Sequence, residues 1–173
     1  VTLALIDTSV MLDFVGQITD HTAEWLGDLA ADTAGPVMVF GHHHAWNPDS
    51  HERPEKYFGI DPTDSEKLVA VFEAHPNLVG YWAGHTHRNR VRQFNATGTR
   101  PWAEVACVKD FPGTWAEYRV YEEGVLQIHR RISTPEALDW SEQTRQMYAG
   151  GYFHYSFGEL HDRCYVIPTV PGR

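Results

Sequence analysis

The sequence predicts an α/β fold in which a parallel sheet is joined to an antiparallel region. Short apolar runs alternate with helical patterns through residues 1–83, and this alternation is typical of βαβ units. From residue 102 onward the pattern changes to extended runs joined by tight turns, which indicates antiparallel strands. The length of 173 residues suits one domain with a substantial core.

The first half of the chain contains two predicted helices between three predicted strands. Residues 20–32 carry an apolar stripe at helical spacing, and Asp20 is the expected N-cap. Thr63 and Glu66 have the spacing of a capping box, which would open a second helix that ends before Pro76. The three strands are expected at residues 1–6, 37–40 and 78–83.

The second half predicts a strand, a hairpin around a Glu-Glu-Gly turn, and a helix. We expect the strand at residues 102–108, the hairpin at 115–121 and 125–132, and the helix at 133–147. The remaining residues 150–173 are rich in glycine and aromatic side chains, and the pattern does not assign them a structure.

Composition and charge narrow the classes of function. The formal net charge of −9 disfavours a nonspecific nucleic-acid binder, so no nucleic-acid partner is expected. No stretch approaches the roughly 18 apolar residues of a membrane span. The two cysteines fit no metal spacing, and Cys107 is expected to be buried and inert in a strand, with a disulfide to Cys164 left open. Because the chain begins at Val1 inside a predicted strand, we expect it to be the C-terminal part of a longer protein, so localisation is unknown, with a lean to the cytoplasm.

Two clusters of histidines each follow a predicted strand. The clusters are Gly41-His42-His43-His44 and Gly84-His85-Thr86-His87. Ligands collect at the carboxyl ends of strands in open α/β sheets, and imidazole is the commonest metal-ligating side chain. Because residues two apart in extended backbone point the same way, His85 and His87 are expected to converge on one site. The sequence therefore predicts a metal site at this sheet edge.

These histidine motifs resemble the last two metal motifs of calcineurin-like metallophosphoesterases, a family that includes purple acid phosphatases and bacterial cyclic-nucleotide phosphodiesterases. Asp7-Thr8 at a strand end and Trp25-Leu26 in the next helix resemble the layout of the same family. The resemblance implies a four-layer α/β/β/α sandwich, incomplete here at the N-terminus. On this basis residues 1–132 are the C-terminal part of the catalytic domain, and residues 133–173 form a helix and tail packed on or near it.

The resemblance also implies a function and a set of site residues. The protein would be a hydrolase of a small phosphomonoester or phosphodiester that uses two Mn, Fe or Zn ions and a bridging hydroxide. His42 and His85 would bind one ion and His87 the other, and His43 would lie near the substrate as the candidate catalytic residue. The oligomeric state is not implied.

The chain departs from this family in the upstream motifs. The Asp-x-His, Gly-Asp-x-x-Asp and Gly-Asn-His motifs are absent, since the matching letters at residues 49–51 lie in a predicted loop and those at 27–32 in a predicted helix. Without these carboxylates we expect weak metal binding and no appreciable catalysis from the chain alone. The alternatives are a non-catalytic calcineurin-like scaffold and a simple histidine-based Zn²⁺ or Ni²⁺ binder.

Two further residues, Asp7 and Arg88, have two possible roles each, and His129 has one expected position. Asp7 could orient a ligand histidine, although capping of a turn is favoured. Arg88 could pair with a substrate phosphate, although a solvated surface position is favoured. His129 is expected on the surface of the hairpin.

Overall fold

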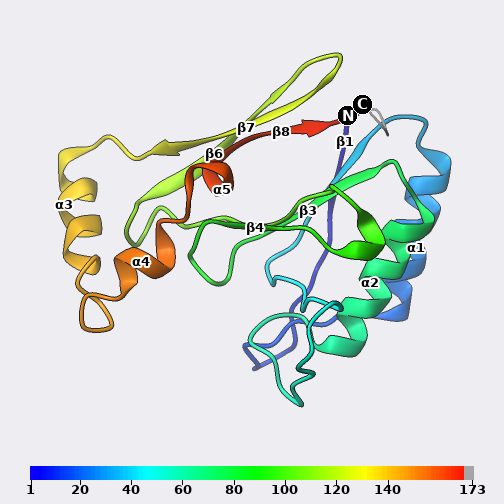
Figure 1. Ribbon diagram of the computed structural model, residues 1–173, viewed down its shortest axis with the longest axis horizontal. Coiled ribbons are helices and arrows are strands. Elements are labelled where there is room, and N and C mark those ends of the chain that lie inside the picture. The colour runs from blue at the N-terminus through cyan, green and yellow to red at the C-terminus, as the bar shows by residue number, and fades with distance from the viewer. Residues whose placement is uncertain (170–173) are drawn as a thin grey trace.

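The computed structural model describes residues 1–169, which form two sheets packed face to face with helices on one outer side (Figure 1). The larger sheet has five strands, and four of them run parallel while the last pairs antiparallel at one edge. In spatial order its strands are β1 (Thr2–Leu5), β2 (Val37–Phe40), β3 (Leu78–Ala83), β5 (Trp102–Glu104) and β4 (Arg90–Arg92).

The smaller sheet is antiparallel and confirms the predicted hairpin. Its strands lie in the order β6 (Thr114–Val120), β7 (Gly124–Arg131) and β8 (Cys164–Pro168). The third strand was not predicted and comes from the aromatic tail. Val170–Arg173, the last residues of that tail, lie outside the described part of the chain.

Two long helices cover the outer face of the five-stranded sheet. They are α1 (Asp20–Asp32) and α2 (Pro62–Ala74), which lie side by side, while α3 (Pro135–Thr144) and α4 (Tyr152–Ser156) lie at the opposite end of the molecule (Figure 1). A short η1 (Asn95–Thr97) follows β4, and α5 (Leu160–Arg163) leads into β8. The α/β sandwich is confirmed, and residues 1–169 build the layers helix, sheet and sheet. Within these residues no helix has the length and apolar character needed to cross a bilayer.

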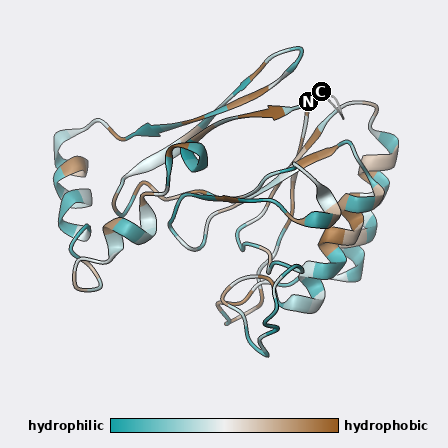
Figure 2. Ribbon diagram, in the orientation of Figure 1, coloured by the Kyte–Doolittle hydropathy of each residue, from teal (hydrophilic) through white to brown (hydrophobic). Residues whose placement is uncertain are grey.

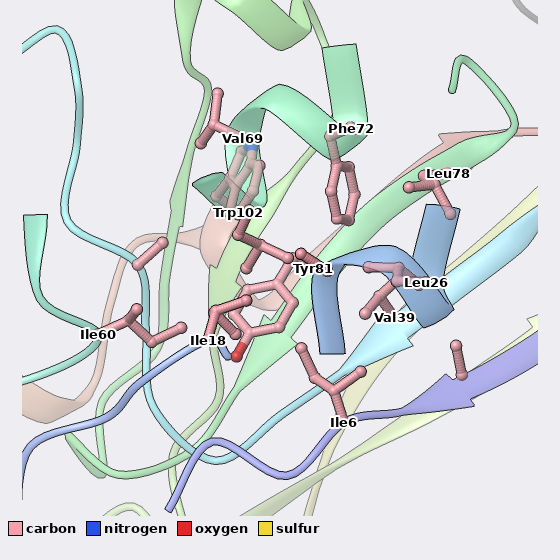
Figure 3. Close-up of a cluster of buried hydrophobic side chains, with 14 of the residues drawn as sticks. Ile6, Ile18, Leu26, Val39, Ile60, Val69, Phe72, Leu78, Tyr81 and Trp102 are labelled. Atoms are coloured by element: carbon pink, nitrogen blue, oxygen red, sulfur yellow. The ribbon is translucent and has the colours of Figure 1, made fainter. Parts of the chain in front are cut away.

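Two apolar clusters hold these layers together. The first lies between the helices and the five-stranded sheet, where Leu26, Phe72 and Trp102 are fully buried (Figure 3). Hydrophobic and hydrophilic residues accordingly alternate around α1 and α2 (Figure 2). The second cluster lies between the sheets, and there the indole of Trp82 donates to the buried amide oxygen of Gln127 at 2.8 Å. A buried polar group with a partner avoids the cost of desolvation.

The capping residues at the starts of the two long helices differ from the prediction by one or two positions. Thr19, not Asp20, caps α1, because its hydroxyl accepts the backbone N–H of Thr22 at 3.1 Å. Asp61 caps α2 in the same way, so the predicted capping box is wrong. Glu66 instead pairs with Arg53 of the preceding loop.

The strand predicted at residues 102–108 ends at Glu104, because its neighbour β3 ends at Ala83 and offers no further backbone partners. Beyond this point the backbone N–H of Ala106 donates to the side chain of Asn89 instead of to a strand. Helix α3 is likewise shorter than the predicted 133–147, starting at Pro135 and ending at Thr144.

The missed strand β4 depends on one buried carboxylate. Glu104 is 1% exposed, and Arg88 and Arg90 lie at 2.8 and 3.0 Å from its oxygens, with Arg92 at 3.7 Å. Burial opposes ionisation of Glu104, but His44 and the arginines outweigh it and lower its pKa to about 2. The solvated position favoured for Arg88 is therefore wrong, because its guanidinium is bound to Glu104.

We predict that Glu104→Gln destabilises the chain by about 3 kcal/mol, since three guanidiniums would lose the only carboxylate among them. Urea unfolding followed by circular dichroism measures this change. Glu66→Gln is the matched control, because Glu66 pairs with Arg53 at an exposed position, where the loss should stay below about 1 kcal/mol. Equal losses in the two variants would contradict the role assigned to Glu104.

Candidate metal centre

The two histidine clusters meet because β2 and β3 are parallel neighbours that end together. Phe40 pairs with Trp82, and just beyond them the backbone N–H of Gly84 donates to the carbonyl of His42 at 3.0 Å. Gly41 makes this turn possible, because a Cβ there would overlap the hydroxyl of Tyr81. The predicted meeting of the clusters at one sheet edge is therefore what the structure shows.

Three imidazoles form the centre of the site. His42, His43 and His85 each offer a ring nitrogen, and these atoms lie within 4.8 Å of one another. The Nε2 of His42 is 3.2 Å from the Nδ1 of His85, and the ring centroids of His43 and His85 are 4.5 Å apart. This is the arrangement that a transition-metal ion with imidazole ligands requires.

His87 follows His85 in the second motif and contacts a buried carboxylate. His85 and His87 both lie in the left-handed backbone region, with φ of 49° and 54°, and not in the expected extended backbone. Both side chains nevertheless line the same hollows, and the Nδ1 of His87 lies 2.8 Å from the buried carboxylate of Asp110. A left-handed conformation in two non-glycine residues stores strain of the kind found at functional sites.

His43 is held from three sides. The hydroxyl of Thr8 lies 2.9 Å from its Nδ1 and accepts its backbone N–H at 3.2 Å, and the hydroxyl of Tyr81 donates to its carbonyl at 2.6 Å. Tyr81 itself is fixed in the core (Figure 3). The sequence marked Thr8 only as part of the strand end Asp7-Thr8 and predicted no contact for it. The neighbouring Asp7 accepts from the backbone and hydroxyl of Ser9, as expected for a turn cap.

Burial favours the neutral form of His43 and His85. It lowers the pKa of His85 to about 4, with a smaller contribution from the neighbouring His43 and His42, and it also lowers the pKa of His43. Among residues 1–169 the Nε2 of His85 is buried without a hydrogen-bond partner. A buried nitrogen with a free lone pair is costly unless something binds it, so the residues present fit a metal ion.

Asp110 and Cys107 lie beside His87 on the loop after β5. Burial opposes ionisation of Asp110, but hydrogen bonds from Lys109 and His87 outweigh it and lower its pKa. Cys107 is half-buried in this loop and accepts the backbone N–H of Asp110 at 3.4 Å, so the expected buried strand position is wrong. Cys107 and Cys164 are both free. No sequence signal marked Asp110, since it lies 23 residues from its partner.

Two other histidines also have lowered pKa values, and one of them, His44, lies 6.4 Å from the ring of His85 between centroids. His44 packs on Tyr57, and burial lowers its pKa to about 3. His129 is half-buried on β7, not on the sheet surface as expected, and burial lowers its pKa to about 4.

Two hollows flank the histidines and are lined mainly by apolar groups. One has a volume of 480 Å³ and reaches His42, His85 and His87 from the side of the smaller sheet. The other, of 570 Å³, lies between the long loop and α4, where the ring of Phe58 packs 4.1 Å from that of His85. Neither hollow is lined by a lysine or arginine from the described part of the chain.

The chain is similar to known proteins both in sequence and in structure. No family model matches the chain. It is 27% identical over 179 residues to a glycerophosphodiester phosphodiesterase of Enterobacter lignolyticus (strain SCF1), covering 99% of this chain and 58% of that protein. The fold resembles that of a dimetal phosphatase from Danio rerio with a TM-score of 0.52 and 16% identity, over 67% of this chain and 36% of the other. The chain thus spans little more than half the length of the curated relative.

The lowered histidine pKa values predict a loss of stability in acid. In the unfolded chain these histidines take up protons below a pH of about 6.5, whereas folded His44 and His85 resist protonation until pH values of about 3 and 4. The unfolded state therefore binds more protons in this window, and stability falls as the pH drops.

The free energy of unfolding should therefore fall with decreasing pH, and we expect His44→Gln to reduce this slope by about 1 kcal/mol per pH unit between roughly pH 6 and pH 4. Urea unfolding at several pH values measures it, and His21→Gln, at an exposed position of α1, is the control. An unchanged slope in His44→Gln would show that His44 is not the buried neutral ring described here.

Proposed function

We propose that this chain, which is related to the calcineurin-like metallophosphoesterases, carries part of the active site of a metal-dependent phosphoester hydrolase. The observation that carries the proposal is the convergence of His42, His43 and His85 at the ends of two parallel strands, with the Nε2 of His85 left without a partner in the described chain. The substrate class is a small phosphomonoester or phosphodiester.

The surroundings of the histidines support a metal-dependent reaction. A phosphoester is anionic, yet neither hollow beside the histidines offers a lysine or arginine from the described residues. Positive charge at this place would therefore come from bound cations. When bound, a pair of such ions polarises a phosphoryl oxygen and lowers the pKa of a bridging water.

The proposal assigns the ligands in two groups. His42 and His85 would hold one ion, and His87, whose ring lies beside Asp110, would hold the other. Mn, Fe and Zn all suit imidazole combined with carboxylate ligands. Three neutral rings supply no negative charge to a cation, so further carboxylates from the rest of a longer protein belong to this proposal.

His43 has a different role in the proposal. The hydroxyl oxygen of Thr8 accepts the backbone N–H of His43, and the hydroxyl proton of Thr8 can therefore be donated to Nδ1 of the His43 ring. A neutral ring that accepts at Nδ1 carries its proton on Nε2. Nε2 of this neutral ring can therefore donate a hydrogen bond to the oxygen of a leaving group, whereas full transfer of a proton would require the imidazolium form.

We predict that the longer protein containing this chain, supplied with Mn²⁺, hydrolyses an aryl phosphodiester. His85→Ala should lower kcat/KM by more than the roughly 10- to 100-fold that loss of a group behind a metal ligand costs. His51→Ala, at an exposed position of the long loop, should leave the rate unchanged.

Two results would contradict the proposal. Full activity in His85→Ala would show that His85 is not a ligand of a catalytic metal ion. Metal binding without hydrolysis of any aryl phosphoester would favour a simple metal-binding protein, and a folded protein that binds no metal would favour a scaffold.

A further inference from the structure

We propose that Asp110 is a positioning residue for His87. Its carboxylate takes the Nδ1 proton of the imidazole and thereby leaves the Nε2 lone pair free for a metal ion. This inference rests on the proposed function in one respect only, namely that a metal ion is what Nε2 binds.

The contact between the two side chains dictates where the proton lies. The Nδ1 of His87 is 2.8 Å from Oδ2 of Asp110, a hydrogen-bond distance. An ionised carboxylate can only accept, so the imidazole must be the donor and Nδ1 must carry the proton. In a neutral ring Nε2 is then a bare acceptor. Metal-ligating histidines generally have their other nitrogen bound to such a carboxylate or to a carbonyl.

Asp110 is itself held in place by groups from other parts of the chain. Its side chain is 5% exposed, and Lys109 contacts Oδ1 at 2.9 Å while the hydroxyl of Tyr152 lies 3.5 Å from Oδ2. The next residue, Phe111, donates its backbone N–H to the hydroxyl of Thr144 at 2.7 Å. The loop that carries Asp110 is therefore fixed by α3 and α4.

The backbone of His87 shows why an outside partner is needed. Its φ of 54° is a conformation that a non-glycine residue adopts only when its surroundings impose it. On one side Thr86 is buried, and on the other Arg88 is bound to buried Glu104. The contacts of Thr86 and Arg88 fix the main chain of His87, but they do not fix the rotation of its ring. The contact with Asp110 fixes that rotation.

The alternative hypothesis is that His87, Cys107 and Asp110 bind a metal ion of their own at a separate metal site, since their ligand atoms lie within 4.8 Å of one another. Two ligands at about 2.0–2.1 Å from a tetrahedral ion stand about 3.3 Å apart. The 2.8 Å between Nδ1 and Oδ2 is shorter than this and fits a hydrogen bond. The thiol of Cys107 is 3.9 Å from the same oxygen.

The position of the proton can be read directly by long-range ¹H–¹⁵N correlation spectra of the imidazoles in the chain. The spectra are recorded at about pH 8.5, well above the ordinary histidine pKa of about 6.5. The ring signals of His87 are identified as those that disappear in His87→Gln. We expect these signals to show the proton on Nδ1. Asp110→Ala should move the proton to Nε2, the form that free histidine prefers.

Two variants control for structural damage. Asp110→Asn keeps an oxygen acceptor of the same size in place and should retain the Nδ1 proton, even if Asp110→Ala loosens the loop. Lys109→Ala removes the other partner of Asp110 and should also retain it. Thermal unfolding shows which variants are folded.

Zn²⁺ affinity, measured by chelator competition, gives the second readout. Asp110→Ala should weaken binding by about 10- to 100-fold. Asp28→Ala, which removes an exposed carboxylate of α1, should leave it unchanged. A proton on Nε2 in the unaltered chain would overturn the proposal, and so would equal Zn²⁺ affinity in the unaltered chain and Asp110→Ala. A thiolate-to-Co²⁺ absorption band that Cys107→Ser abolishes would overturn it in favour of the separate metal site. If no variant binds metal, the proposed function loses its support while the spectra still decide the role of Asp110.

Discussion

The parallel pairing of β2 and β3 is the constraint on which the site depends. Both strands end at the same level, so the loops that follow them bring their histidines within 4.8 Å of one another. Every residue of β3 is buried, because helices cover one face of its sheet and the smaller sheet covers the other. The position of the histidine rings is therefore set by the core, and a shift of either strand would separate them.

Around this pair of strands, residues distant in the sequence fix the individual rings. Thr8 and Tyr81 hold His43, and Asp110 holds His87. Burial favours the neutral form of His43 and His85, which suits them for binding a cation but provides no charge to balance it. In the proposed function, the described residues supply the imidazole half of a metal centre. The carboxylate half is proposed to come from elsewhere in a longer protein.

The parts of the fold with a strong local pattern were predictable. Strand 37–40 and helix 20–32 match the structure in their bounds, and the hairpin is confirmed within one residue at each strand end. Strand β4 was missed because its alternating arginines resemble a solvated loop until Glu104 is known to be buried against them. The contacts of His43 with Thr8 and of His87 with Asp110 span 35 and 23 residues and leave no local pattern. The extended backbone expected at His85 and His87 is wrong, because both residues adopt left-handed backbone.

X-ray absorption spectroscopy of the Zn²⁺-loaded chain tests the central claim most directly. If the strand-end histidines form the metal centre, the spectrum will show nitrogen ligands at about 2.0–2.1 Å with the outer-shell scattering of imidazole rings. The number of imidazoles should fall by one in His85→Ala. A first shell of oxygen alone, or one that His85→Ala leaves unchanged, would show that these histidines do not bind the metal.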